Sequence, residues 1–125
     1  MIGTVSIFVF GSNERGAHGK GAALFAKRYR GAVYGQAEGL QGDSYAIPTK
    51  DAVLRPLPLT AIEIYVERFL SFAAAHPTLI FTVTPIGCGL AGYAASDIAP
   101  MFQDAPANCQ LPASFLAAIS SANAR

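Results

Sequence analysis

Two apolar runs that each end in a glycine-rich loop constrain this chain more than any other feature. Val5–Phe10 is a near-continuous run of apolar, strand-forming residues, and Leu79–Pro85 is a second one. Runs of this kind favour central strands of a sheet that is covered on both faces. The first run is followed by a glycine-rich loop at His18–Ala23, and the second continues directly into another at Gly87–Tyr93. Each loop leads into a predicted helix, so the pattern strand, loop, helix occurs twice.

The residues between these units predict the remaining elements. Thr60–Ala75 is the clearest helix, because its apolar residues recur at helical spacing and Thr60 with Glu63 forms a predicted capping box. Glycine is frequent between residues 31 and 42, which predicts a loop with a short strand at most. The other expected elements are a helix at Gly19–Arg30, a strand at Ser44–Ile47 closed by Pro48, a short helix at Asp97–Gln103 capped by Ser96, and a helix at Leu111–Ser121 with Pro112 in its first turn.

This order of elements predicts the fold class. The chain has 125 residues, which corresponds to one domain spanning residues 1–125. Alternating strands and helices indicate an α/β fold of three layers, with a mostly parallel central sheet and helices on both faces. Ligands of such folds bind at the carboxyl ends of the strands. Both glycine-rich loops leave such an end, so we expect them at one edge of the molecule.

Composition excludes several function classes. The formal net charge is +1 and 14% of the residues are charged, so bulk electrostatics favour neither nucleic acid nor a membrane as a partner. Two cysteines make neither a disulfide framework nor a zinc site, and no metal site is predicted. The first residues lack the basic region of a signal peptide, and no apolar run reaches membrane-spanning length. We therefore expect a cytoplasmic protein.

The chemistry of the two loops points to an anionic ligand. Small residues allow the backbone to approach a ligand closely, and the first N–H groups of a helix have no partner within the helix. Such a place accepts phosphate groups. A dinucleotide-binding domain of the Rossmann type is a competing interpretation, but Gly19-Lys20-Gly21-Ala22-Ala23-Leu24 lacks the third glycine of its fingerprint.

Four strings of residues carry a family resemblance. They are Gly11-Ser12-Asn13, His18-Gly19-Lys20-Gly21-Ala22-Ala23-Leu24-Phe25, Ile47-Pro48-Thr49-Lys50 and Pro85-Ile86-Gly87-Cys88-Gly89-Leu90. Together they resemble the macro-domain family over residues 7–101. The likeness is closest to the branch that contains terminal ADP-ribose protein glycohydrolase and the antitoxins that remove ADP-ribose from DNA.

The resemblance implies roles for individual residues. Asn13 matches the asparagine that binds the distal ribose, and Lys50 matches the lysine that attacks the anomeric carbon, so these two are the catalytic candidates. Gly19–Ala23 matches the loop around the distal ribose and diphosphate, and residues 87–91 match the phosphate-binding loop. No cofactor is implied. The candidate ligand-binding residues are Gly11, Ser12, Asn13, His18, Gly19, Lys20, Gly21, Ala22, Ile86, Gly87, Cys88, Gly89, Leu90, Ala91, Gly92 and Tyr93.

The sequence departs from that branch in two places. The hydrolases place an aspartate directly after G-C-G-L, and here the position is Ala91. An acid/base partner for Lys50 would then have to be Asp51, Asp43 or Asp97. The family also reads the adenine amino group with an early aspartate, whereas no acidic residue precedes Asn13.

Three functions remain open at this point. The first is an ADP-ribosyl glycohydrolase or deacylase, and the second is a macro-type binding module without turnover. In both, the partner is an ADP-ribose-like small molecule or an ADP-ribosylated macromolecule, with nucleic acid only as a modified substrate. The third is a nucleic-acid-binding domain that uses the basic residues Lys20, Lys27, Arg28 and Arg30.

A Cys88 thiolate is a further candidate nucleophile, although no motif ties it to a histidine. Tyrosines that could stack on a base are Tyr34, Tyr45 and Tyr93.

Overall fold

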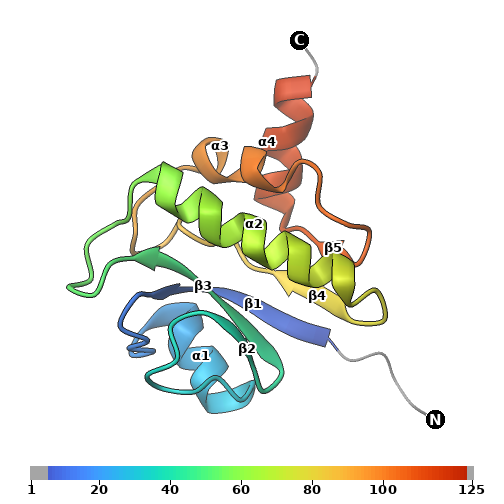
Figure 1. The fold of residues 1–125 in the computed structure, drawn as a ribbon. Helices are drawn as coiled ribbons and strands as arrows, with labels where there is room; N and C mark the ends of the chain where they lie inside the picture. Colours follow the sequence, from blue (N-terminus) through green and yellow to red (C-terminus); the bar gives the residue numbers. More distant parts are fainter. Residues whose placement is uncertain (1–5, 124–125) are drawn as a thin grey trace.

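A mixed five-stranded sheet forms the centre of the molecule. The structure, a computed structural model, describes residues 6–123. The strand order is β2-β3-β1-β4-β5, and the elements succeed one another along the chain as shown in Figure 1. The strands are β1 (Ser6–Asn13), β2 (Gly39–Gln41), β3 (Ser44–Lys50), β4 (Ile80–Val83) and β5 (Cys109–Gln110). The helices are α1 (Gly21–Tyr29), α2 (Leu59–Ala75), α3 (Ala95–Ile98), the 3₁₀ helix η1 (Ala99–Phe102) and α4 (Ala113–Asn123).

The two predicted central strands lie side by side in the sheet. β1 is the middle strand and pairs in parallel with β3 on one side and with β4 on the other. β5 extends the parallel part, and only the short β2 runs antiparallel, against β3. The mostly parallel sheet that the sequence predicted is therefore confirmed; Val5, the first residue of the predicted strand, lies outside the described residues.

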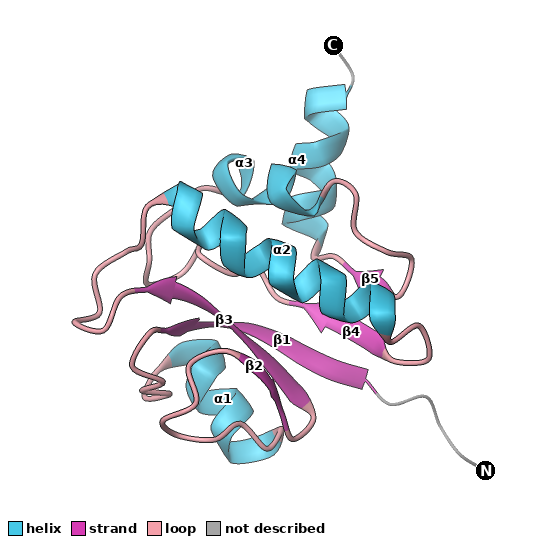
Figure 2. Ribbon diagram, viewed as in Figure 1, coloured by secondary structure: helices cyan, strands magenta, loops and turns pink. Residues whose placement is uncertain are grey.

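Helices cover both faces of the sheet, which completes the predicted three-layer α/β fold (Figure 2). α2, α3 and α4 lie on one face, and α1 lies on the other. The alternating side chains of β1 explain this division: Ile7 and Val9 belong to the larger core under α2, whereas Phe10 belongs to a smaller core under α1. The buried residues of both cores are mainly apolar, as expected for strands that helices cover.

Two strands run further than the sequence predicted. β1 continues through the expected turn at Gly11-Ser12-Asn13, and β3 continues through Pro48 to Lys50. Proline is tolerated there because β2 pairs with β3 only as far as Ala46, so the edge beyond it needs no donor. The extension aligns Asn13 with Lys50 at the carboxyl ends of neighbouring strands.

Two predicted helix caps are wrong. α2 begins directly after Pro58 and has no side-chain cap, so Thr60 lies inside the helix and forms no capping box with Glu63. Proline just before a helix has a backbone conformation that suits this position. Ser96 also lies inside its helix, because the turn starts one residue after Ala94.

The predicted short helix at Asp97–Gln103 divides into α3 and η1, and an aspartate stabilises its start. The Asp97 carboxylate accepts the backbone N–H of Ala94 at 3.0 Å. The C-terminal helix is close to its prediction, with Pro112 at the residue before α4. The carbonyl of Pro112 accepts the N–H groups of Phe115 and Leu116.

Candidate functional site

A pocket of about 300 Å³ opens at the carboxyl ends of β1, β3 and β4. It lies between the start of α1 and the loop that follows β4, so the structure brings both glycine-rich loops together and Gly21 and Gly89 share one cavity. This is where ligands of parallel α/β folds bind. The residues that line the pocket are Gly11, Lys20, Gly21, Ala22, Ala23, Thr49, Lys50, Thr84, Pro85, Ile86, Gly87, Cys88, Gly89, Leu90 and Ala91.

The first turn of α1 presents unpaired backbone donors to this pocket. Lys20 is the residue before the helix, and its extended backbone is not accompanied by a side-chain cap. The first bond along the helix runs from the N–H of Leu24 to the carbonyl of Lys20, at 3.2 Å. The three preceding N–H groups, of residues 21–23, have no acceptor among residues 6–123. No acidic residue lies in this turn, so the partial positive charge of the helix end is uncompensated.

The loop after β4 presents a second set of donors. Hydrogen bonds from Cys88 N–H to Pro85 and from Tyr93 N–H to Gly87 hold its shape, at 3.2 and 2.8 Å. The N–H groups of Gly89, Leu90 and Ala91 have no acceptor within the described part of the chain. Backbone donors that converge in this way form an anion-binding concavity.

Gly87 explains why this loop needs glycine at its start. Its φ of +74° is in the left-handed region, which side chains other than glycine rarely adopt. A Cβ atom there would lie 3.1 Å from Cδ1 of Ile98 in α3. Gly89 differs, because its φ is ordinary and a Cβ atom would meet nothing within 4 Å. Gly87 therefore shapes the loop, whereas Gly89 keeps the pocket open.

The charged side chains of the pocket are both lysines. Lys20 and Lys50 line it, and no lining residue carries a carboxylate. Neither lysine has an ion-pair partner among residues 6–123. The charged side chains of the lining therefore favour an anionic ligand.

The three aspartates that could have assisted Lys50 are placed elsewhere. Asp51 turns back on its own loop, where one carboxylate oxygen accepts the N–H groups of Val53 and Arg55, both at 2.9 Å. The N–H of Arg55 lowers the pKa of Asp51 most, and although desolvation opposes it, the N–H of Val53 and the Arg55 guanidinium lower the pKa further. Asp43 and Asp97 do not line the pocket either. None of the three aspartates therefore lines the pocket together with Lys50.

Cys88 lines the pocket as a neutral thiol. Burial raises the pKa of Cys88, and the nearby carboxylate of Asp97 raises it further. A thiol becomes a nucleophile only as the thiolate. The structure therefore opposes the interpretation of Cys88 as an activated nucleophile.

Six of the predicted ligand-binding residues lie outside the pocket lining. Asn13 is 4% exposed, and its amide both donates to and accepts from the backbone of Ala17, at 2.9 and 3.0 Å. It therefore closes the turn after β1 and does not face the cavity. The others are Ser12, His18, Gly19, Gly92 and Tyr93.

His18 lies furthest from the predicted role, because its side chain is buried in the protein interior. It is fully buried, stands edge-on to the ring of Phe10, and its Nε2 lies 3.1 Å from the carbonyl of Gln36 and from Oε1 of Gln41. Tyr93 likewise donates its hydroxyl to the carbonyl of Leu57. Nε2 of His18 and the hydroxyl of Tyr93 therefore bond within the protein, while Nδ1 of His18 is buried without a partner among the described residues.

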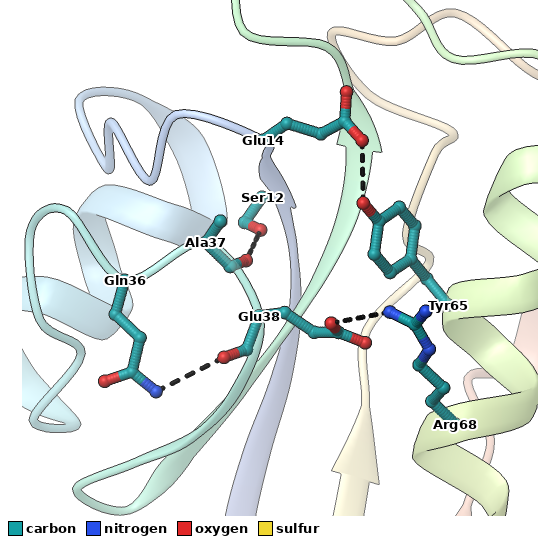
Figure 3. A network of polar contacts seen from close by, with 7 residues as sticks. All are labelled: Ser12, Glu14, Gln36, Ala37, Glu38, Tyr65 and Arg68. Carbon is teal, nitrogen blue, oxygen red and sulfur yellow. Dashed lines mark hydrogen bonds and ion pairs between the residues drawn. The ribbon is translucent and has the colours of Figure 1, made fainter.

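Polar contacts tie the end of β1 to α2 and to the loop before β2 (Figure 3). The hydroxyl of Tyr65 donates to the carboxylate of Glu14 at 2.7 Å, and Arg68 pairs with Glu38 at 3.0 Å. On the other side, Ser12 donates to the carbonyl of Ala37. The N–H of Glu14 also donates to the carbonyl of Lys50 at 2.9 Å. The network therefore fixes the strand ends from which the pocket opens.

Four lining residues were not among the predicted site residues. Thr49 and Thr84 stand at the ends of β3 and β4, Pro85 follows Thr84, and Ala23 lies in the first turn of α1. A usable signal was present, because all four belong to the strand ends or to the glycine-rich loop that predicted the site. The sequence did not indicate which side chain at each strand end faces the cavity.

Neither a candidate metal site nor a candidate membrane-spanning helix occurs among the described residues. The described residues contain no group of three or more His, Cys, Asp and Glu side chains that could hold a metal ion. Within residues 6–123 no helix has both the length and the apolar character needed to cross a membrane.

Comparison with known proteins supports the fold. Neither the protein-family models nor the curated proteins give a match. Among solved structures, a protein of unknown function from Bacteroides thetaiotaomicron is similar with a TM-score of 0.62 and 16% identity, over 89% of this chain and 88% of that one. A macrodomain protein from Streptomyces coelicolor is similar with a TM-score of 0.56 and 18% identity, over 89% of both chains. The chain therefore has the fold of a macrodomain protein.

Proposed function

We propose that this chain binds ADP-ribose or a closely related diphosphate-ribose ligand in the pocket at the carboxyl ends of β1, β3 and β4. The observation that carries the proposal is the donor set of that pocket: two lysines and two groups of unpaired backbone N–H groups, without a carboxylate in the lining. The macrodomain fold of the Streptomyces coelicolor structure supports the same ligand class.

The two donor groups suit a diphosphate. One phosphate would accept N–H groups from the first turn of α1, and the other would accept them from residues 89–91. A hydrogen bond to a charged group is worth about 1.5–3 kcal/mol, so a few such bonds supply micromolar affinity. Lys20 and Lys50, which both line the cavity, add charge attraction.

The size of the cavity indicates which part of the ligand is enclosed. Its volume of about 300 Å³ is at the lower end of the range for small-molecule sites. We infer that the diphosphate and one ribose are enclosed and that the base lies at the rim. No acidic side chain in the lining is available to read an adenine amino group.

Binding without turnover fits the site better than hydrolysis. In a lysine mechanism, Nζ of Lys50 would attack the anomeric carbon while the leaving group departs with the bonding electrons and takes up a proton. The lining contains no carboxylic acid to give that proton, because the position after Leu90 is Ala91. Lys50 itself lies in the pocket, and this observation keeps hydrolysis as the second candidate.

Calorimetric titration separates the ligands. ADP-ribose should bind with micromolar affinity, and AMP and ribose 5-phosphate should bind at least about tenfold more weakly, because each has one phosphate for two donor groups. The inosine analogue of ADP-ribose should match ADP-ribose. No heat of binding with ADP-ribose would refute the proposal, and a strong preference for adenine would refute the inferred orientation.

A turnover assay with ADP-ribosylated protein and DNA separates binding from hydrolysis. We expect no release of ADP-ribose by the wild type and a gain with Ala91→Asp, since this substitution restores an acid beside the loop. Release by the wild type that is lost in Lys50→Ala would instead establish the lysine mechanism.

A further inference from the structure

A second surface of the molecule combines exposed aromatic rings with cations. Phe25 and Tyr29, one helical turn apart on α1, are 45% and 69% exposed. Their ring centroids are 5.2 Å apart, and Phe25 lies 5.1 Å from the ring of Phe8 on β1. Arg30 extends the row, with its guanidinium carbon 5.9 Å from the Phe8 centroid. We call these residues, with the exposed Arg28, the aromatic–cation patch.

The patch lies on the face of the sheet that α1 occupies, opposite α2, α3 and α4 (Figure 2). Beside the patch the sheet surface is polar. The hydroxyl groups of Ser6 in β1 and of Thr82 in the neighbouring strand β4 share a hydrogen bond of 2.9 Å in an exposed position. Phe25 and Tyr29 are not part of the small core under α1, which consists of Phe10 and four alanines with Phe8 packed against it.

Charge is segregated toward this part of the molecule. Residues 15–37 contain no acidic residue but hold five of the nine lysines and arginines, namely Arg15, Lys20, Lys27, Arg28 and Arg30. The net charge of the chain is only +1, so the rest of it is acidic on balance. A second copy of the chain would bring like charges together at this patch, whereas a polyanion would complement them.

The combination of aromatic rings and cations indicates which class of polyanion would bind. Proteins that bind single-stranded nucleic acid stack successive bases on aromatic side chains and pair the phosphates with arginine and lysine. Phe25 and Tyr29 offer neighbouring ring surfaces. Arg28 is exposed and directly precedes Tyr29 in α1, whereas Arg30 packs against Phe8 and donates from its guanidinium to the carbonyl of Ser6 at 2.8 Å. We propose that the aromatic–cation patch binds a single strand of nucleic acid without sequence specificity. This proposal is independent of the pocket and of its ligand.

Fluorescence anisotropy with labelled single strands of about 12 nucleotides tests the proposal directly. Both DNA and RNA arms are measured, with duplex DNA and inorganic polyphosphate as competitors. The association constant should fall as the salt concentration rises. A plot of its logarithm against the logarithm of the salt concentration should have a slope of about −0.7 for each phosphate that is contacted. Polyphosphate should compete poorly, because it has no bases to stack. A difference between the DNA and RNA arms would identify which strand the patch prefers.

Two exposed substitutions separate stacking from charge. Tyr29→Ala should weaken binding at least about fivefold, which is the lower value for one stacked base. Arg28→Gln should reduce the salt slope by about 0.7. The matched controls are Leu116→Ala, another exposed apolar side chain on α4, and Arg55→Gln, an exposed arginine on the loop before α2. Both controls should bind as the wild type does.

Three outcomes would overturn the proposal. One is the absence of binding to either strand at low salt. Another is binding that Tyr29→Ala and Arg28→Gln leave unchanged or that polyphosphate displaces fully. The third is a dimer in sedimentation experiments that Tyr29→Ala dissociates, because the patch would then be a contact between two copies of the chain.

Discussion

At the scale of single residues, a substitution at Gly89 tests most directly whether the ligand binds at this loop. A Cβ atom there has open space around it, and the backbone is not in the left-handed region. Gly89→Glu should therefore fold while placing a carboxylate among the donors of the loop. We expect affinity for ADP-ribose to fall by more than about tenfold, since two like charges a few ångströms apart repel strongly at the protein surface.

The control for this substitution is Ala117→Glu. It adds the same charge at an exposed position of α4, away from the pocket lining. Calorimetry should give wild-type affinity for this variant. Equal affinities for the two variants would show that the ligand binds elsewhere.

Cys88 gives a second prediction at the same scale. Because burial and Asp97 raise the pKa of Cys88, its thiol should react slowly with iodoacetamide near neutral pH. The reaction should become faster as the pH rises and should be slowed further by bound ADP-ribose, since Cys88 lines the pocket. Mass spectrometry of the modified peptide measures both effects. Rapid modification at neutral pH, unaffected by ligand, would contradict this description of the site.

At the scale of elements, the uncapped start of α1 links stability to binding. Lys20→Asp should supply the missing side-chain cap and stabilise the helix by about 1 kcal/mol, or about 4 °C in Tm. The same carboxylate would occupy the N–H groups that are offered to phosphate. ADP-ribose affinity should therefore fall while thermal stability rises.

The matched change is Lys27→Asp in the last turn of α1. A carboxylate there opposes the helix dipole, so stability should fall slightly and affinity should stay unchanged. Scanning calorimetry and titration of both variants provide the comparison. If both variants lost affinity equally, charge alone and not the helix start would govern binding.

The contact between β1 and α2 predicts an alkaline effect. The Glu14 carboxylate raises the pKa of Tyr65 from 10.0 to about 12, and burial raises the pKa of Tyr45 to a similar value. In the unfolded chain both tyrosines lose their protons earlier, so stability is complete below pH 10 and is lost as the pH rises toward about 12. Urea unfolding across this range should show a smaller loss in Tyr65→Phe than in the wild type. An identical loss in both proteins would exclude a contribution from this contact.

The elements also show what periodicity could and could not predict. The apolar runs identified β1 and β4 because Val9 and Phe10 of β1 and Phe81 and Val83 of β4 are buried, although Thr82 of β4 is exposed. The same runs could not indicate where the strands end: β1 continues through Gly11-Ser12-Asn13, since pairing with β3 outweighs the local preference for a turn. The predicted cap at Thr60 failed because Pro58 already fixes the backbone where α2 begins.

At the scale of the whole molecule, the prediction that both glycine-rich loops lie at one edge of the sheet is confirmed. The fold brings together two loops about seventy residues apart, and both line one pocket. The side chains were less predictable, because the amide of Asn13 and the ring of His18 satisfy partners from other loops that only the folded chain supplies. Backbone donors could be anticipated from glycine spacing, whereas burial of individual side chains depends on contacts distant in sequence.

The most direct measurement of the central claim is a titration of isotopically labelled protein with ADP-ribose, followed by NMR. If ADP-ribose binds in the pocket, saturable shifts should be confined to the amides of residues 20–23, 49–50, 84 and 86–91, which surround it. The amides of α4 should remain unchanged, as should those of Phe25 and Tyr29 in the aromatic–cation patch. Shifts concentrated outside the pocket, or no saturable shift at all, would contradict binding in this pocket.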